Sequence, residues 1–311
     1  MRALFTAVIA AVLSIHSASA QANPKFKVLV MGQPDDNHPQ TGAAGIKAVQ
    51  EIAAGQAYTV DAITDPGKLT DAYLAQYQVL IVVMGWQGEW SATTRSAVQK
   101  FVEAGKGWMG FHVSTLAGIY PTPWPWYDTW VGGIAFKGHP GTRQTGTIKL
   151  EATALDHPAL AGLPANFGLH EEWYSWTATP RGKPNISILA AVDESTYDPQ
   201  GTGMGKDHPV IWSNTLYGPM ILTSLCHEPE AYANANVRKF IANAIPWLAK
   251  SGTTAARPML AMPARSVTPV LRWNGRGLLF ESYPQGPERT RAAELFSFSA
   301  LGRRTDPDPA R

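Results

Sequence analysis

Short apolar runs, separated by segments of mixed polarity, fill the first half of the chain. Four of them predict strands: Phe26–Met31, Tyr58–Ile63, Val79–Met84 and Trp108–Phe111. The run Val79–Met84 (VLIVVM) is apolar at every position. Uninterrupted apolar strands of this kind are typical of a sheet that is covered on both faces.

Segments of helical pattern separate these strands. Thr41–Ala54 carries Ile46, Val49 and Ile52 along one stripe, a short helix is expected at Asp71–Gln76, and Ser91 is a suitable N-cap for a helix that runs to Glu103. Alternating strands and helices predict an α/β fold with a mainly parallel sheet. Because crossovers are right-handed, the carboxyl ends of the parallel strands should meet at one edge.

The second half is richer in strands. Strand-like runs occur at Thr147–Glu151, Ile186–Val192, Pro209–Ser213 and Pro219–Leu225. A helical pattern follows from Ala231 to Lys250, and Pro246 should kink or end that helix because proline lacks a backbone N–H.

Both ends of the chain differ from the body. Arg2, an apolar run from Ala3 to Ile15 and small residues at Ala18 and Ala20 predict a signal peptide, residues 1–20, cleaved after Ala20. The protein is therefore expected in the periplasm or outside the cell. Residues 251–311 are rich in Arg and Pro and predict a linker and a disordered tail; a small module or a frame error in the gene are the alternatives. No other stretch is apolar enough for a membrane span.

Charge and cysteine content exclude some classes. The net charge is +2, and no dense basic stripe of the kind that nucleic-acid binders carry is present. Cys226 is the single cysteine, so no internal disulfide can form. We favour a buried apolar role for Cys226 over a catalytic thiolate.

Polar residues that follow the predicted strands are the first candidates for a site, since ligands bind at the carboxyl ends of open α/β sheets. His38 follows the first strand, Trp86 the third, His112 and Ser114 the fourth, and His227 the last. Imidazoles act as metal ligands or as acid–base groups. His38, His112, His139 and His227 with Glu172 would suit a zinc-type site if they converge, although no metal-binding spacing is present. A structural role for any single histidine is an alternative, and turn roles are favoured for His157 and His208.

Aromatic residues cluster beside these histidines. Trp124, Trp126 and Tyr127 lie in a stretch interrupted by prolines, which we interpret as a loop lining a carbohydrate-sized site. Glu172 precedes Trp173 and Tyr174, so that a carboxylate should lie against an aromatic platform. Ser114 lacks the flanking glycines of a nucleophile elbow, so a serine hydrolase is the weaker alternative.

The ordered series of motifs resembles the ThuA-like family, named for trehalose utilisation, over residues 25–250. The motifs are GFHVS at 110–114, PWYDTWVGG at 125–133, FKGHP at 136–140, EEWY at 171–174 and LCHEPEAY at 225–232. The resemblance implies a flavodoxin-like, three-layer fold similar to that of class I glutamine amidotransferases. It places His112 where those enzymes have their cysteine nucleophile. It departs at Cys226, where the family commonly has glycine.

The resemblance further implies action on keto-sugars or 3-keto-glycosides, by isomerisation, elimination or hydrolysis. We expect His112, Glu172 and His227 to be catalytic. Substrate contacts are expected from His38, Trp86, Trp124, Trp126, Tyr127, Trp173 and Tyr174, and a divalent metal such as zinc would assist. The expected partner is a small carbohydrate, with a homodimer left open. The alternative is a non-catalytic carbohydrate-binding or interaction module.

Overall fold

The computed structural model describes residues 25–119, 122–250, 270–273 and 278–281. The chain divides into two units, Met1–Arg257 and Pro258–Arg311. The described part of the second unit is an antiparallel pair, β12 (Val270–Trp273) and β13 (Leu278–Glu281); the rest of the predicted linker and tail lies outside the described residues. The predicted signal peptide lies outside the described residues. None of the described helices is both long enough and apolar enough to cross a membrane.

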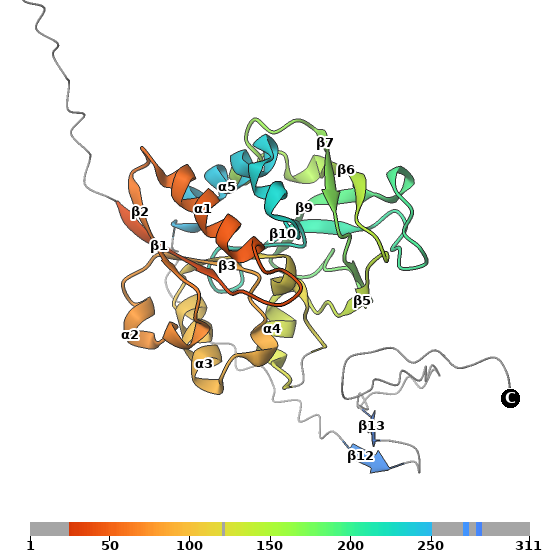
Figure 1. Ribbon diagram of the computed structural model, residues 1–311, viewed down its shortest axis with the longest axis horizontal. Helices are drawn as coiled ribbons and strands as arrows, with labels where there is room; N and C mark the ends of the chain where they lie inside the picture. The colour runs from red at the N-terminus through yellow and green to blue at the C-terminus, as the bar shows by residue number, and fades with distance from the viewer. Residues whose placement is uncertain (1–24, 120–121, 251–269, 274–277, 282–311) are drawn as a thin grey trace, which may run out of the picture. The chain divides into compact units, whose positions relative to one another are not determined.

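A nine-stranded sheet forms the centre of the first unit, in the order β2-β1-β3-β4-β11-β10-β9-β6-β7 (Figure 1). Its strands are β1 (Phe26–Gly32), β2 (Tyr58–Ile63), β3 (Val79–Val83), β4 (Gly107–Phe111), β6 (Gln144–Leu150), β7 (Asn166–Glu171), β9 (Ile186–Asp193), β10 (Pro209–Asn214) and β11 (Met220–Thr223). The first five strands in spatial order are parallel, and the other four pair antiparallel. Only β6 and β10 therefore run against the rest, and the prediction of a mainly parallel sheet is confirmed.

Helices cover both faces of the sheet. The helices α1 (Thr41–Ala53) and α5 (Ala235–Leu248) lie on one face, while α2 (Asp71–Leu74), α3 (Ala92–Glu103) and α4 (Pro125–Trp130) lie on the other (Figure 1). The predicted bounds of α1 and α3 are confirmed, as is the N-cap, because Ser91 accepts a hydrogen bond from the Thr94 N–H. Pro246 does not end α5 at once, since the helix continues to Leu248.

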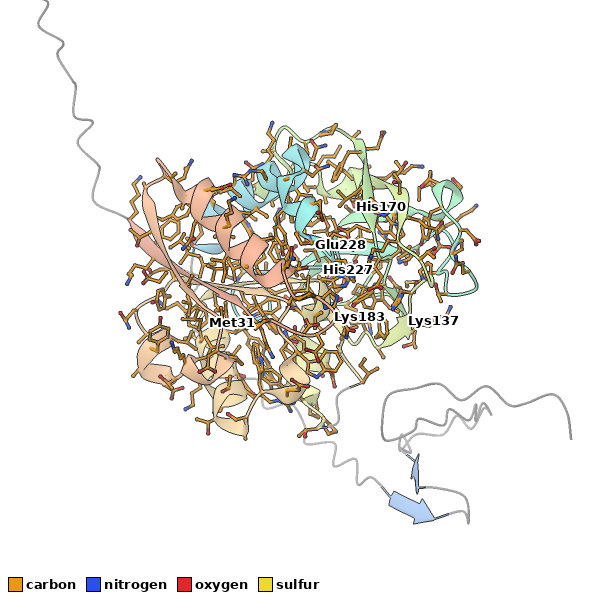
Figure 2. The ribbon with its side chains drawn as sticks, in the orientation of Figure 1. Met31, Lys137, His170, Lys183, His227 and Glu228 are labelled. Atoms are coloured by element: carbon orange, nitrogen blue, oxygen red, sulfur yellow. The ribbon has the colours of Figure 1, made fainter. Side chains whose placement is uncertain are left out.

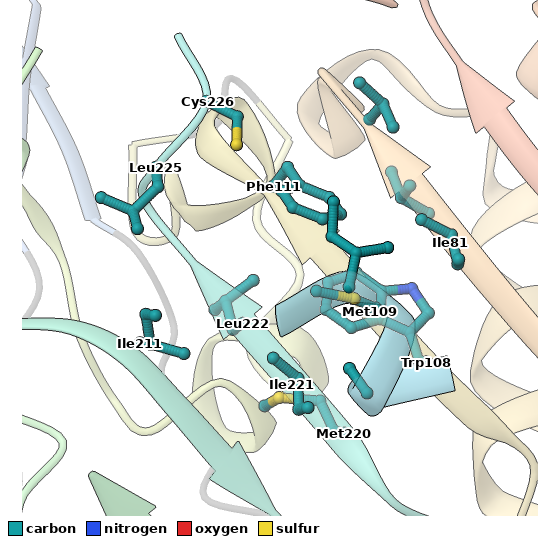
Figure 3. Packing of buried hydrophobic residues seen from close by; sticks show 14 of the residues in the cluster. Ile81, Trp108, Met109, Phe111, Ile211, Met220, Ile221, Leu222, Leu225 and Cys226 are labelled. Atoms are coloured by element: carbon teal, nitrogen blue, oxygen red, sulfur yellow. The ribbon is translucent and has the colours of Figure 1, made fainter. Parts of the chain in front are cut away.

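The parallel strands are the most deeply buried part of the protein. Every residue of β3 and β4 is buried, as the uninterrupted apolar runs predicted. Figure 3 shows Trp108, Met109 and Phe111 of β4 packed beside Met220, Ile221 and Leu222 of β11. Burial on both faces makes these strands a rigid support for the residues that follow them.

The antiparallel half of the sheet curls back toward the parallel half. Strand β7 is four positions from β11, a separation of about 19 Å in a flat sheet. Yet Glu171, the last residue of β7, accepts a hydrogen bond of 2.7 Å from the Cys226 N–H just beyond β11. Since a flat sheet could not bring these groups together, the strands between them must twist and coil strongly. The curl brings Glu172, the residue after β7, to the edge where the parallel strands end.

Two short strands, β5 (Phe136–Gly138) and β8 (Ser175–Trp176), pair in a separate small sheet. His139 directly follows β5, and Tyr174 directly precedes β8.

Candidate functional site

Sharp backbone turns follow three adjacent parallel strands. Met84 after β3, His112 after β4 and Cys226 after β11 have φ values of 55°, 43° and 73°. This left-handed conformation is costly for residues other than glycine, by about 1 kcal/mol or more each. It redirects the chain at once, so that His112 and His227 lie at the sheet edge. Figure 2 shows His227 and Glu228 near the centre of the first unit.

Four side chains converge at this edge: His38, His112, His227 and Glu172. One donor atom from each lies within 4.8 Å of all the others. His227 Nδ1 is 3.1 Å from His38 Nε2 and 2.9 Å from His112 Nε2. Glu172 Oε2 is 3.1 Å from His227 Nδ1 and 3.4 Å from His112 Nε2. The predicted convergence of these residues is therefore present in the structure.

A second group holds the other ring nitrogen of each histidine. His112 Nδ1 donates to the Ser224 carbonyl oxygen at 2.8 Å, and His38 Nδ1 donates to the Asp35 carboxylate at 2.9 Å. His227 Nε2 lies 3.6 Å from Glu228 Oε1. The partners of His38 and His112 fix the proton on the outer nitrogen of each ring, so that the lone pairs of their inner nitrogens point into the cluster. Metal-binding histidines have outer partners of the same kind.

Burial and hydrogen bonding set the charge of the cluster. Burial lowers the pKa of His112 to about 4, which keeps its imidazole neutral near pH 7. Burial alone would raise the pKa of Glu172, but the hydrogen bonds of His112 and His227 outweigh it and hold that pKa well below its usual range. The cluster therefore combines the neutral imidazole of His112 with the carboxylate of Glu172.

The donor distances fit a bound cation. Ligand atoms about 2.1 Å from a metal ion lie about 3.0 to 3.4 Å apart in octahedral or tetrahedral geometry. Four of the six donor pairs lie 2.9 to 3.4 Å apart, and all six lie within 4.8 Å. Without a cation, three acceptor atoms would compete for the one proton that His227 Nδ1 can carry. The residues present thus suit a divalent metal.

His139 takes a different place from the one predicted. Its Nδ1 donates to the Pro140 carbonyl oxygen at 2.8 Å and lies 3.3 Å from Glu172 Oε1, the oxygen that faces away from the histidine cluster. His139 is therefore not among the converging donors, and its prediction as a metal ligand is corrected. Its side chain is 36% exposed, so it can meet a ligand from solvent.

Glu171 supports the backbone turn that carries His227. This carboxyl is fully buried and accepts hydrogen bonds from the N–H groups of Cys226 at 2.7 Å and His227 at 3.1 Å. Burial raises its pKa to about 8, against the opposing effect of these hydrogen bonds. Glu171 thus holds the turn that carries His227.

Two cavities adjoin the cluster. The larger, of about 940 Å³, includes Glu172, Arg143 and Glu228 in its lining. The smaller, of about 470 Å³, includes His38, Trp86 and Tyr174. Both volumes are in the range of small-molecule sites.

Comparison with known proteins defines the family. A family model described as trehalose utilisation, ThuA, matches residues 13–248. The chain belongs to the ThuA family. No curated protein matches it.

The chain is also similar to several solved structures. A ThuA-like protein from Bacteroides uniformis has 26% sequence identity and a TM-score of 0.63, over 73% of this chain and 92% of that one. A ThuA-like protein from Parabacteroides merdae has 17% identity and a TM-score of 0.56, over 76% and 94%. PurLQS from Thermotoga maritima has 13% identity and a TM-score of 0.47, over 73% and 99%. The predicted family and fold class are confirmed.

The aromatic residues of this ThuA-family protein divide into two groups. Trp86 and Tyr174, expected to contact substrate, line the smaller cavity, and the centroid of the Tyr174 ring lies 4.1 Å from that of His112. Trp124, Tyr127 and Trp173 are buried core residues that line neither cavity, and Trp126 packs between Trp124 and Trp130.

The interpretation of this aromatic stretch as a sugar-binding loop was therefore wrong. The stretch forms helix α4, with Pro125 in its first turn, where a missing N–H costs nothing. The short helix turns Tyr127 and Trp130 inward, where they pack edge-on against Trp108 of β4.

Other sequence candidates have structural roles. Ser114 is fully buried, and its hydroxyl donates to the Val82 carbonyl oxygen, as a structural residue would. Burial raises the pKa of Cys226 well above its ordinary value, in agreement with an apolar role. His157 caps a short turn, and His208 is held between Glu194 and the Tyr174 carbonyl oxygen.

Sequence analysis gave Asp35, Arg143, Glu171 and Glu228 no role in the site. Asp35 follows the first strand and Glu228 follows the last, so both satisfy the edge rule, but that rule does not distinguish them from their neighbours. Arg143 reaches the site through its 2.7 Å ion pair with Glu228, a contact that no local pattern indicates.

Proposed function

We propose that this ThuA-family protein is a metal-dependent enzyme that acts on glycosides carrying a ketone at C3. The observation that supports the proposal is the convergence of His38, His112, His227 and Glu172 on one point beside two cavities. The family's link to trehalose utilisation supports a carbohydrate substrate.

The four converging side chains would hold the ion. Imidazole and carboxylate ligands suit zinc and the neighbouring transition metals. A bound divalent ion would act as a Lewis acid toward the ketone oxygen. Asp35 and Ser224 orient the imidazoles of His38 and His112 through their outer nitrogens, and Glu228 lies 3.6 Å from the outer nitrogen of His227. In this assignment His112 and His227, expected to be acid–base groups, serve as ligands.

His139 is the group placed to move a proton. Its Nδ1–H donates to the Pro140 carbonyl oxygen, so its Nε2 carries a lone pair that can act as a base. The ketone at C3 acidifies the C2–H bond. His139 takes the C2 proton, a double bond forms between C1 and C2, and the C1–O bond breaks with its electron pair on the glycosidic oxygen. The imidazolium then gives its proton to that oxygen, which completes the elimination.

The test combines metal analysis with turnover. We expect the purified protein to contain about one divalent ion per chain and to convert a 3-keto-glucoside. His38→Ala and Glu172→Gln should lose both the ion and the activity. His112→Asn tests the third ligand without added backbone strain, because asparagine tolerates the left-handed conformation at this position. His139→Ala should keep the ion and lose about 100-fold or more in kcat.

The matched control is His157→Asn, which alters a histidine outside the cluster and keeps an acceptor for the Ala159 N–H. It should retain both ion and activity. Full activity in His38→Ala and Glu172→Gln would contradict the proposal. Sugar binding without any product in the metal-loaded protein would favour the non-catalytic binding module instead.

A further inference from the structure

The connection between β9 and β10, residues 194–208, contacts the segment that carries His139. We call residues 137–144 the His139 segment; it includes the end of β5 and the start of β6. No residue of the β9–β10 connection belongs to the lining of either cavity beside the cluster. Any effect of this connection on the site must therefore pass through the residues that it holds.

Gln200 makes the contacts nearest to His139 along the chain. Its Oε1 accepts a hydrogen bond of 2.8 Å from the Gly141 N–H, two residues after His139. Its Nε2 lies 3.4 Å from the Thr142 hydroxyl oxygen. One side chain thus holds two consecutive residues of the His139 segment.

The His139 segment in turn reaches the connection from both of its ends. Gln144 Nε2 donates to the Asp198 carbonyl oxygen at 2.7 Å, and Gln144 Oε1 accepts from the Asp198 N–H at 3.0 Å. Lys137 Nζ donates to the Gly203 carbonyl oxygen at 2.9 Å. The segment is therefore held before His139 as well as after it.

The backbone at Gln200 is itself unusual. Gln200 has a φ of 49° and is followed by Gly201 with a φ of 81°. The left-handed conformation is costly for glutamine, and glycine would adopt it without strain. Gln200 is exposed, so burial of its side chain does not offset this cost. Its described side-chain contacts are those with the His139 segment.

Glu194 anchors the connection at the other end. Its carboxylate accepts hydrogen bonds from the N–H groups of Met204 and Gly205, the latter at 2.9 Å. Only 12% of the Glu194 side chain is exposed. A carboxylate that accepts several hydrogen bonds in a partly buried position holds a loop more firmly than an exposed contact does.

The same carboxylate acts on the aromatic neighbour of His139. Glu194 Oε1 lies 2.7 Å from His208 Nδ1, and His208 Nε2 lies 2.8 Å from the Tyr174 carbonyl oxygen. The Tyr174 ring stacks on the His139 ring, with 5.7 Å between their centroids. The connection therefore supports His139 both through its own segment and through the ring on which it stacks.

We infer that the β9–β10 connection positions His139 beside Glu172, with Gln200 and Gln144 as positioning residues outside both cavities. The inference rests on the proposed function for the role of His139 as a base. A base must lie within hydrogen-bonding reach of the proton that it removes. A displacement of about 1 Å can cost about 100-fold in rate, so contacts that fix the flanking backbone affect kcat.

Gln200→Gly in the metal-loaded full chain tests the inference, because it removes the side-chain contacts and relieves the left-handed strain. The midpoint of chemical denaturation should hardly change. We expect kcat for a 3-keto-glucoside to fall about tenfold, while KM changes less than about threefold and the ion content stays the same. Hydrogen exchange of the Gly141 amide should become about tenfold faster.

Two further variants separate positioning from a general effect on the fold. Gln200→Glu keeps an acceptor for the Gly141 N–H and should keep kcat within about twofold of the unmodified protein. Asn185→Gly makes the matched change at another exposed left-handed position, with a φ of 63°, which lines neither cavity. It should alter neither kcat nor exchange at Gly141.

A double-mutant cycle tests whether the effect passes through His139. In the His139→Ala background, Gln200→Gly should lower kcat by less than about twofold, because the group that it positions is gone. An equal loss of about tenfold in both backgrounds would overturn the inference, since the connection would then act without His139.

Hydrogen exchange needs no substrate, so it separates this inference from the proposed function. If Gln200→Gly speeds exchange at Gly141 but the unmodified protein converts no 3-keto-glucoside, the proposed reaction fails and the positioning of the His139 segment stands. If Gln200→Gly changes neither exchange nor kcat while His139→Ala loses its activity, the positioning fails and the enzyme proposal stands.

Discussion

The Nδ1 atom of His227 lies 2.9 Å from the Nε2 atom of His112, although 115 positions separate the two residues in the chain. His112 Nε2 must accept, because the Nδ1–H of the same ring donates to the Ser224 carbonyl oxygen. In the absence of a cation, His227 Nδ1 can donate to only one of its neighbours. A divalent ion would accept all of these lone pairs at once. The rise in the free energy of unfolding when the ion is added should therefore measure metal binding.

Adding a divalent ion should therefore stabilise the protein. An ion present at 100 times its dissociation constant adds about 2.7 kcal/mol to the free energy of unfolding, which corresponds to a rise in Tm of roughly 5–10 °C for a unit of this size. Thermal denaturation with and without zinc or manganese, after treatment with a chelator, measures the effect. His112→Asn should abolish the shift, while His170→Ala, in the larger cavity but outside the cluster, should retain it. An equal shift in both variants would refute binding at this cluster.

Glu171 provides a second test, because it acts on His227 through the backbone. In Glu171→Gln, one oxygen remains to accept from the Cys226 and His227 N–H groups, and the new amide N–H₂ cannot accept from either. We expect the free energy of unfolding to fall by about 1–3 kcal/mol and metal affinity to fall about tenfold. Chemical denaturation and metal titration measure the two effects.

The control for this variant is Glu151→Gln, which removes the exposed ion pair with Arg181. It should change the free energy of unfolding by less than about 1 kcal/mol and leave metal affinity unaltered. A Glu171→Gln protein with normal metal affinity would show that His227 is positioned without this carboxyl.

The part of the site that sequence could predict is the part that sheet topology dictates. His38, His112 and His227 each follow a parallel strand, and the parallel order of β1, β4 and β11 brings their carboxyl ends to one edge. Buried Val, Ile and Leu runs mark such strands clearly in a sequence. The convergence of these three residues needed no information beyond that pattern.

The sequence pattern does not explain why Glu172 lies in the site. Strand β7 alternates exposed Asn166, Gly168 and His170 with buried Phe167 and Leu169, and it was not predicted. Asparagine and glycine disfavour strands, so a local reading misses it. Its contact with β11 depends on the coil of the intervening strands, which is a property of the whole sheet.

Cys226 shows how local backbone geometry explains a departure from a family pattern. Its φ of 73° lies in the left-handed region, where the glycine that the family commonly has would be unstrained. The thiol is buried among the apolar side chains around β4 and β11 (Figure 3), so its packing can offset part of the strain. Thiol reagents should label Cys226 only after unfolding, which mass spectrometry across a denaturant series would show; rapid labelling of the native protein would contradict the buried position.

The two aromatic groups make opposite predictions for stability and binding. Trp124 is buried and stacks on Tyr127, so Trp124→Ala should lower the free energy of unfolding by about 3–5 kcal/mol. Trp86 lines the smaller cavity, so Trp86→Ala should mainly weaken sugar binding. Urea denaturation and calorimetry on both variants separate the effects. A Trp124→Ala protein of normal stability that has lost sugar binding would restore the sugar-binding interpretation of this stretch.

His157 should make stability depend on pH independently of the cluster. Burial lowers the pKa of His157 to about 4, its Nε2 has no hydrogen-bond partner, and its ring packs against Trp247. The unfolded chain, with an ordinary pKa near 6.5, binds the proton more readily than the folded protein. The contribution to stability is thus complete above about pH 6.5 and is lost progressively as the pH falls toward about 4.

The difference between the protein and its His157→Asn variant isolates this effect. Asparagine does not titrate and keeps the hydrogen bond from the Ala159 N–H. We expect the variant to lose less stability than the unmodified protein between pH 6.5 and 4.5, by up to about 2 kcal/mol. Urea denaturation at pH 4.5, 5.5, 6.5 and 7.5 measures both proteins. Because the other titrating groups are common to both, parallel pH profiles would show that His157 does not resist protonation in the folded state.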